Sequence, residues 1–250
     1  MNALVCQVLL LAAIAGVLGL PAWRQSSKRI WLWLAMLVVA IDQLMIGLPI
    51  VYPQLQPFHG AWNWGGKCLS LIASLIFAWL LIRSGRMNRS SLGLTWTQNP
   101  GTLRLIVRLV IPFLVIWALL LWFVFGVPTP ATTETHAYEL SMPGLTEELV
   151  YRGLLLGLWT RAFTDTAEPG LRLGYAGIAS SVLFALAHGI GVTDAGQGLQ
   201  LTLHWMPMAL PLGSGVLLAI CRQRSGSLLL PVAFHNALNE LTVLVNLFKP

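Results

Sequence analysis

The stretch LTEELVYRGLLLGLW, residues 145–159, places two adjacent carboxylates and an arginine at the head of a strongly apolar segment. A charge at the centre of a membrane helix costs at least about 2.5–3.5 kcal/mol on insertion scales. Glu147, Glu148 and Arg152 must therefore be shielded from lipid, paired, or used for function. On a helix, Glu148 and Arg152 share a face and can form an ion pair, whereas Glu147 points about 100° away from Glu148. This pattern fits one paired and one available carboxylate, or a purely structural salt bridge with Glu147 capping the helix start.

The composition around this stretch is that of a membrane protein. Hydrophobic residues make up 56% of the 250 residues and charged residues only 10%, against about 25% charged residues in soluble domains. The sequence predicts an all-α fold, a polytopic transmembrane bundle of about eight spans, in a single integral membrane domain over residues 1–250. The first apolar segment lacks the basic start of a signal peptide and is interpreted as a retained anchor. The expected spans are 3–23, 30–52, 62–82, 104–126, a helix from Pro143, 174–191, 199–220 and 227–248.

The basic residues predict the orientation of this bundle. Twelve of the fifteen fall on one side of an eight-span arrangement: Arg24, Lys28, Arg29, Arg83, Arg86, Arg89, Arg104, Arg108, Arg161, Arg172, Arg222 and Arg224. Only Lys67 and Lys249 fall on the other side. The positive-inside rule then places both termini outside the cytoplasm, in a multi-pass protein of the plasma (inner) membrane. Because these residues are dispersed among loops, the net charge of +6 indicates topology and a lipid bilayer partner, and no nucleic-acid partner is expected.

The same orientation makes the loops 53–61, 127–142 and 192–198 external. The loop VPTPATTETHAYELSMP (127–143) leads directly into the segment with Glu147. Its prolines and threonines favour an irregular surface segment over a helix. We expect this loop to border the mouth of a cavity.

Two further polar groups interrupt apolar helices near the end of the chain. FALAHG contains His188, and GSLLLPVAFHNALNE contains His235 and Asn239, which are four residues apart and share a helix face. Each group alone is also compatible with ordinary hydrogen bonding, at the membrane interface or between helices. Together with Glu147 they supply a general base and hydrogen-bond donors for a developing oxyanion. These are the groups needed to add water to an amide carbonyl without a serine or cysteine nucleophile.

The order E-E-x-x-x-R, F-x-x-x-H and H-x-x-x-N resembles the CAAX protease and bacteriocin-processing family of intramembrane proteases (CPBP or Abi, including CAAX prenyl protease 2-like members). Here the motifs are Glu147-Glu148…Arg152, Phe184…His188 and His235…Asn239. The run RQRSGSLLLP (222–231) is similar to the approach to the last motif in that family, with Ser225 where threonine is common. The resemblance covers about residues 140–245, the expected catalytic core.

This resemblance implies an intramembrane endopeptidase that hydrolyses a peptide bond in a membrane-associated protein or peptide. It implies that Glu147 activates water beside His188, that His235 and Asn239 form the oxyanion hole, and that Glu148 and Arg152 order the site or bind substrate. Glu147, His188 and His235 could also hold zinc. Because no H-E-x-x-H helix is present, metal-free water activation is favoured and no cofactor is assigned. Since the charges place the site nearer the outer face, an exported peptide or C-terminal sorting signal is expected in preference to a prenylated CAAX tail.

Two other functions fit the same residues. The first is a non-catalytic family member, a membrane protein that binds a peptide or confers immunity through the same cavity. The second is an ion-coupled transporter with Asp42, Glu147 and Glu148 as a relay, although no paired broken helices in repeated halves support it. Formation of a cleaved product separates the protease from both.

Overall fold

The computed structural model describes residues 2–58, 60–124, 131–163, 173–194, 196 and 198–248. Its first half contains α1 (Asn2–Leu18), α2 (Leu20–Trp23), η1 (Ser26–Lys28), α3 (Arg29–Val51), η2 (Pro53–Leu55), α4 (Trp64–Arg83), α5 (Thr102–Leu105), η3 (Ile106–Val110) and α6 (Ile111–Phe123). Its second half contains α7 (Thr133–Glu139), α8 (Met142–Glu148), η4 (Leu149–Leu155), α9 (Leu156–Phe163), α10 (Tyr175–Gly189), β1 (Ile190–Asp194), β2 (Leu199–Leu203), α11 (Met206–Ser225) and α12 (Leu229–Phe248). η1 and η2 are 3₁₀ turns, whereas η3 and η4 are π-helical.

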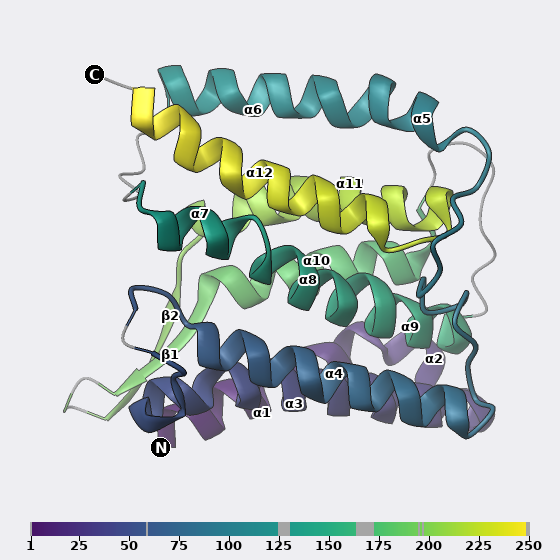
Figure 1. Ribbon diagram of the computed structural model, residues 1–250. Helices are drawn as coiled ribbons and strands as arrows, with labels where there is room; N and C mark the ends of the chain where they lie inside the picture. Colours follow the sequence, from purple (N-terminus) through teal and green to yellow (C-terminus); the bar gives the residue numbers. More distant parts are fainter. Residues whose placement is uncertain are drawn as a thin grey trace.

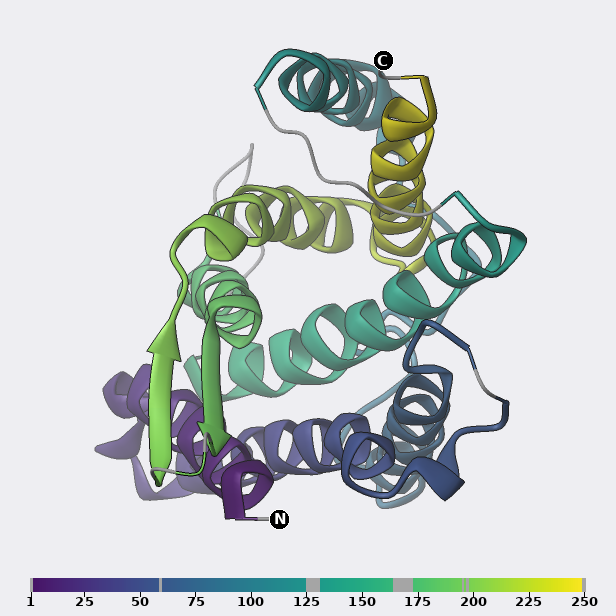
Figure 2. The ribbon, with the colours of Figure 1, turned by 90° about the vertical axis from the view of Figure 1, so that its left-hand side faces the viewer.

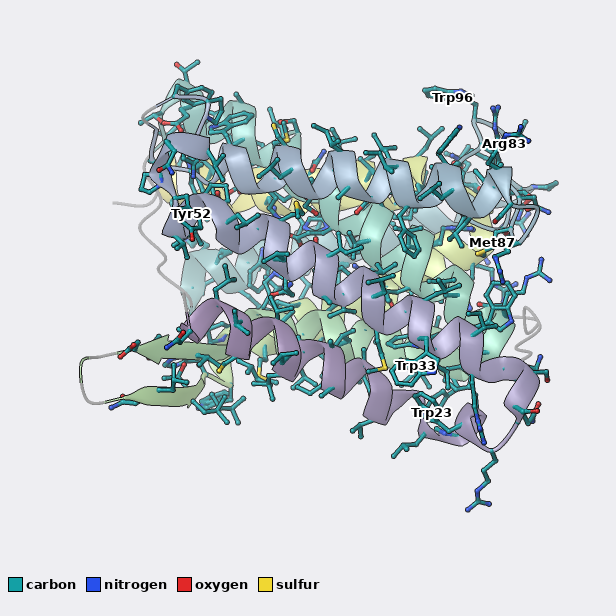
Figure 3. The ribbon with its side chains drawn as sticks, turned by 90° about the horizontal axis from the view of Figure 1, so that it is seen from below. Trp23, Trp33, Tyr52, Arg83, Met87 and Trp96 are labelled. Atoms are coloured by element: carbon teal, nitrogen blue, oxygen red, sulfur yellow. The ribbon has the colours of Figure 1, made fainter. Side chains whose placement is uncertain are left out.

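Long helices run side by side through the molecule, and both termini lie at the same end of the bundle (Figure 1). We call this the terminal end. The opposite end, which we call the arginine end, holds the connections 24–28 and 84–101. Arg83 and Trp96 lie toward the arginine end and Tyr52 toward the terminal end (Figure 3). Arg172 and Lys249, which entered the expected topology, lie outside the described residues.

Small residues bring the helices of the first half together. Gly47 in α3 lies so close to the Leu4 side chain that an added Cβ would overlap it, and an added Cβ on Gly16 in α1 would be in tight contact with Met36. Close backbone approach at small residues is the usual basis of helix association in lipid. The apolar cores of α1, α3 and α4 continue into α9 and α10 through buried residues such as Leu32 and Trp159.

The opening stretch forms the central helix of the second half, where α8, η4 and α9 follow one another without a break. Every residue of η4 is buried, which confirms that the charged stretch lies inside the protein and away from lipid. The π-helical turns widen the helix, and the hydroxyl of Ser180 in α10 donates to the carbonyl of Tyr151 at 2.8 Å. Such π segments occur frequently at functional sites. Figure 2 shows this helix from the terminal end, between α10, α11 and α12 on one side and α3 and α4 on the other.

The α5–η3–α6 helix lies at the edge of the bundle against α12 (Figure 1). Phe113 and Phe234 meet edge to face at 5.8 Å, and the indole of Trp117 donates to the Thr242 hydroxyl at 3.3 Å. Most of its outward side chains are exposed, among them Val115 and Leu119. An apolar exposed face of this length requires a lipid environment.

The membrane character is confirmed, and the number of spans stays a prediction. Among the residues that the structure describes, three helices are long and apolar enough to cross a bilayer alone: Ser26–Val51, Trp64–Arg83 and Thr102–Phe123. Asn2–Leu18 and Tyr175–Gly189 are apolar but shorter. The other expected spans correspond to α8–η4–α9, α11 and α12, whose polar residues belong to the site described below.

The all-α fold class fits the structure, but the helical span expected from residue 199 was wrong at its start. β1 and β2 form an antiparallel hairpin with Ile190 opposite Leu203, so the expected span 199–220 begins only at Met206. The run LQLTL alternates apolar and polar residues with the period of a strand, and Gly196 and Gly198 adopt positive φ in the connection. The apolar content of this run had been interpreted as the start of a helix.

The expectation of an irregular segment before Pro143 was also wrong for the part that the structure describes. Residues 127–130 lie outside the described residues, and α7 follows them. The Thr132 hydroxyl accepts from the backbone N–H of Thr135 at 3.1 Å, which is an N-cap, and Glu134 lies in the first turn. This local capping outweighs the turn propensity of the surrounding threonines and prolines.

Candidate active site

Glu147 lies in the sixth position of α8 with its two carboxylate oxygens in different surroundings. Oε1 accepts from the ammonium of Lys67 in α4 at 2.5 Å. Oε2 is buried and has no hydrogen-bond partner within the part of the chain that the structure describes. Buried carboxylate oxygens normally accept a hydrogen bond, so we expect a donor from outside the described residues at Oε2.

Two imidazoles face this unpartnered oxygen. Nε2 of His188 lies 3.8 Å from Glu147 Oε2, and Nε2 of His235 lies 3.7 Å from it. Nδ1 of His188 lies 2.8 Å from the carbonyl oxygen of Phe184. Because a carbonyl can only accept, Nδ1 carries the proton and the neutral ring presents a lone pair at Nε2. Glu147 Oε2 and His188 Nε2 are thus two acceptors directed at one another, an arrangement that a water molecule satisfies by donating to both.

Glu148 holds the second imidazole and the arginine. Its Oε1 accepts from Nη1 of Arg152 at 3.0 Å and lies 2.7 Å from Nδ1 of His235. Both members of the Glu148–Arg152 pair are fully buried, as the helical spacing predicted. Arg152 also donates to the Gly215 carbonyl at 3.1 Å and lies over the ring of Phe184 at 4.3 Å. The pair therefore ties α8 to α10, α11 and α12.

Asn239 lies one turn beyond His235 on α12, and its amide donates to the carboxylate of Glu139 at the end of α7. Burial raises the pKa of Glu139, and the hydrogen bond from Asn239 opposes that shift. The structure thus brings the predicted residues Glu147, His188 and His235 together directly, with Asn239 beside Glu139 one turn further along α12.

α7 lies between α4 and α12 next to these groups. The Glu134 carboxylate accepts from the backbone N–H of Ala61 at 3.2 Å and from the indole of Trp64 at 3.1 Å. On the other side, Nδ1 of His136 lies 2.7 Å from Oε1 of Glu240. Tyr138 of the same helix stacks on Trp62. These contacts hold α7 on both sides, and its place at the mouth of a cavity stays a prediction.

Lys67 and Glu139 are the two site residues that the sequence did not reveal. Lys67 is alone in the apolar segment 62–82, at the second turn of α4, and was counted only as a charge on one side of the membrane. A single lysine within a span was itself the signal, because an intramembrane ammonium requires a partner. Asp42 of α3 is close to Lys67 and accepts from the Ser70 hydroxyl at 2.5 Å, which places the expected relay residue at the edge of this cluster.

A family comparison agrees with the geometry. The family model described as Rce1-like, type II CAAX prenyl endopeptidase, matches residues 112–241, just over half of the chain. The chain belongs to this family. No curated protein and no solved structure matches the chain.

Membership confirms the resemblance drawn from the motifs and identifies the chain as an integral membrane member of a CAAX-type endopeptidase family. All the motif residues lie in the matched region, from Glu147 to Asn239. Lys67 and Asp42 lie before it, so the ion pair to Glu147 comes from a part of the chain that the family model does not cover.

Zinc binding by Glu147, His188 and His235, which was considered from the sequence, stays a prediction. Within the described residues, no three His, Cys, Asp or Glu side chains are placed to hold one metal ion. Zinc ligands lie about 2.0–2.2 Å from the ion, and Lys67 already holds one oxygen of Glu147. The chemistry below is therefore derived from the side chains alone.

Proposed function

We propose that the chain is an intramembrane endopeptidase in which Glu147 activates water for hydrolysis of a peptide bond. The observation that carries the proposal is the buried, unpartnered Oε2 of Glu147 directed at Nε2 of both His188 and His235. A structural salt bridge alone needs only the Lys67 contact at Oε1. It gives no reason for two imidazoles to face the other oxygen.

In the proposed reaction, a water donates one hydrogen to Glu147 and one to His188. As its oxygen attacks the amide carbon, Glu147 takes the proton, and a C–O bond forms while the carbonyl becomes an oxyanion. When the C–N bond breaks, Glu147 returns the proton to the leaving amine. The products are a new carboxyl terminus and a new amino terminus, so water is consumed and no redox partner is needed.

The oxyanion would receive hydrogen bonds from His235 and from the amide of Asn239. Because Nδ1 of His235 faces the Glu148 carboxylate, its Nε2 can donate only when the ring carries both protons. Glu148 is the counter-ion that such a ring requires, and Arg152 holds Glu148 in place. Glu148 and Arg152 are positioning residues in this scheme, while Lys67 orients the base.

The substrate class follows from the family and from the depth of the site. The family description supports a membrane-associated protein or peptide. Lys67 lies near the start of α4 and His188 near the end of α10. Both of these helix ends lie at the terminal end of the bundle (Figure 1). If the positive-inside rule holds, this end is outside the cytoplasm, which favours an exported peptide or a C-terminal sorting signal over a prenylated tail.

Cleavage is tested with the full chain purified into liposomes and incubated with two probes, a farnesylated CAAX peptide and a membrane-spanning peptide with an exposed C-terminal tail. Mass spectrometry should detect two complementary products with the wild type and none with Glu147→Gln. Asp194→Asn, the same chemical change in the exposed hairpin, should cleave normally. Peptide binding without products would instead establish the non-catalytic, peptide-binding alternative.

The orientation is tested by cysteine labelling of intact cells in a background without Cys6, Cys68 and Cys221. A cysteine at exposed Thr133 should react with a membrane-impermeant maleimide, whereas one at exposed Ser90 should react only after lysis. Ser225, at the same end as Ser90, is fully buried and unsuitable as a reporter. The opposite labelling pattern would favour a prenylated CAAX tail on the cytosolic side as the substrate.

A further inference from the structure

A cavity lies at the arginine end of the bundle, away from Glu147. It has a volume of about 680 Å³, within the range of about 300–1,000 Å³ typical of small-molecule sites. Its walls are the first turns of α5 and η3 on one side and the last turn of α11 on the other. None of the residues assigned to the candidate active site lines it.

Three guanidinium groups line this cavity. Arg104 and Arg108 are four residues apart on one helix, and Arg224 comes from α11. In the sequence Arg224 lies more than a hundred residues after the other two, and the three arginines indicate only the topology. The fold gathers them, because the backbone N–H of Asn99 donates to the Ser225 carbonyl at 2.8 Å and its side chain donates to the Arg224 carbonyl at 3.0 Å.

The positive charge of the cavity is not neutralised by the described part of the protein. Within those residues, none of the three guanidiniums forms an ion pair with a carboxylate, and Nη2 of Arg224 is buried without a hydrogen-bond partner. The sequence from Arg83 to Arg108 contains five arginines and no Asp or Glu. A buried guanidinium nitrogen without a partner costs free energy, so an acceptor from outside the chain fits here.

The position of the cavity indicates the source of that acceptor. Arg104 and Arg108 lie in the first turns of the candidate span Thr102–Phe123, where lipid headgroups meet the protein. Leu105 and Leu109 add an apolar wall beside the arginines. The helix that begins at Thr102 also directs its positive end to this region. A phosphate with apolar chains attached matches all three features, whereas a free phosphate would leave the leucine wall unused.

We propose that this cavity binds the phosphate of an anionic phospholipid headgroup. Guanidinium groups recognise phosphate with paired hydrogen bonds. Basic pockets between membrane helices on the cytoplasmic side are known to hold such headgroups. The bound lipid anchors the peripheral α5–η3–α6 helix to α11. Lipid binding in this cavity does not depend on the proposed protease activity or on Glu147.

The test uses the full chain purified in detergent and titrated with phosphatidylglycerol, phosphatidylcholine or inorganic phosphate, with bound adducts counted by native mass spectrometry. The wild type should bind phosphatidylglycerol in preference to phosphatidylcholine. R104Q/R108Q/R224Q should weaken phosphatidylglycerol binding about tenfold or more. R83Q/R86Q/R89Q removes three exposed charges at the same end but outside the cavity and should bind as the wild type does.

Because Arg224 is partly buried, R104Q/R108Q serves as a second variant that changes only exposed side chains and should still weaken binding about threefold or more. Equal losses in the matched control would overturn the site in favour of general surface charge. Equal binding of both lipids would overturn headgroup recognition. Inorganic phosphate that displaces phosphatidylglycerol at equal concentration would overturn the lipid assignment.

Discussion

The candidate active site has an inner part around Glu148 and an outer part around Glu147. The two adjacent carboxylates differ in burial and in their hydrogen-bond partners. Glu148 is fully buried and bound to Arg152 on its own helix and to His235. The Glu147 side chain is 15% exposed and bound to Lys67 from another helix. Both carboxylates keep one buried oxygen without a hydrogen-bond partner in the described residues, and that of Glu147 faces Nε2 of His188 and of His235. The His188 side chain is 37% exposed, so the outer part is open.

This difference indicates that, in a motif of two adjacent carboxylates, one can stabilise the fold while the other takes part in the reaction. Glu148 is fully buried between Arg152 of its own helix and His235 of α12, so it stabilises the fold and gains nothing from being accessible. Glu147 is partly exposed beside His188, so it can bind water. If variants of Glu147 and Glu148 changed activity and stability alike, the distinction between a reactive and a structural carboxylate would be rejected.

The largest effect is expected at the inner part. Glu148→Gln or Arg152→Met leaves one buried charge unpaired, which costs about 3–5 kcal/mol of the free energy of unfolding. The double variant should lose less than the sum of the two single variants. Thermal unfolding of the four proteins in detergent measures this coupling, and additive losses would show that the two side chains do not interact.

At the outer part, Glu147→Gln should abolish cleavage, by about 10²-fold or more, because an amide cannot accept the proton of water. Stability should fall far less than in Glu148→Gln, since the amide oxygen still accepts from Lys67. Product formation and unfolding are measured on the same preparation. Near-normal turnover by a folded Glu147→Gln protein would reject Glu147 as the base.

The sequence revealed the inner part better than the outer part for a physical reason. Glu148 and Arg152 are four residues apart, so helical geometry alone predicted their pairing. Lys67 and Glu147 are 80 residues apart on different helices, and no local pattern predicts which helices become neighbours. Helix existence was predictable from apolar length. The apolar content of residues 199–203 obscured the hairpin, and the prolines and threonines before Pro143 obscured the N-cap of α7.

A smaller effect is expected when Lys67 is changed. Lys67→Met removes a charge-assisted hydrogen bond, worth about 1.5–3 kcal/mol, and leaves Glu147 less well oriented. Turnover should fall more than substrate affinity, because the base is misplaced while the peptide site is intact. Lys67→Arg, which keeps the charge, should recover much of the turnover. If Lys67→Met and Lys67→Arg lose turnover equally, the role of Lys67 in orienting the base is rejected.

The smallest effect is expected from metal removal. Lys67 holds one oxygen of Glu147, and Nδ1 of both imidazoles is committed, to the Phe184 carbonyl in His188 and to Glu148 in His235. The two Nε2 atoms lie 3.8 and 3.7 Å from the remaining oxygen, and we expect a water to join these atoms, so cleavage should proceed without an added ion. Incubation with EDTA or phenanthroline, followed by the peptide assay, should leave activity within about twofold of the untreated enzyme, because the proton transfers involve only side chains and water. Complete loss that is restored by zinc would assign Glu147, His188 and His235 to a metal site. Glu147 would then be a ligand held in place, as Glu148 is held by Arg152, and the division between a structural and a reactive carboxylate would no longer stand.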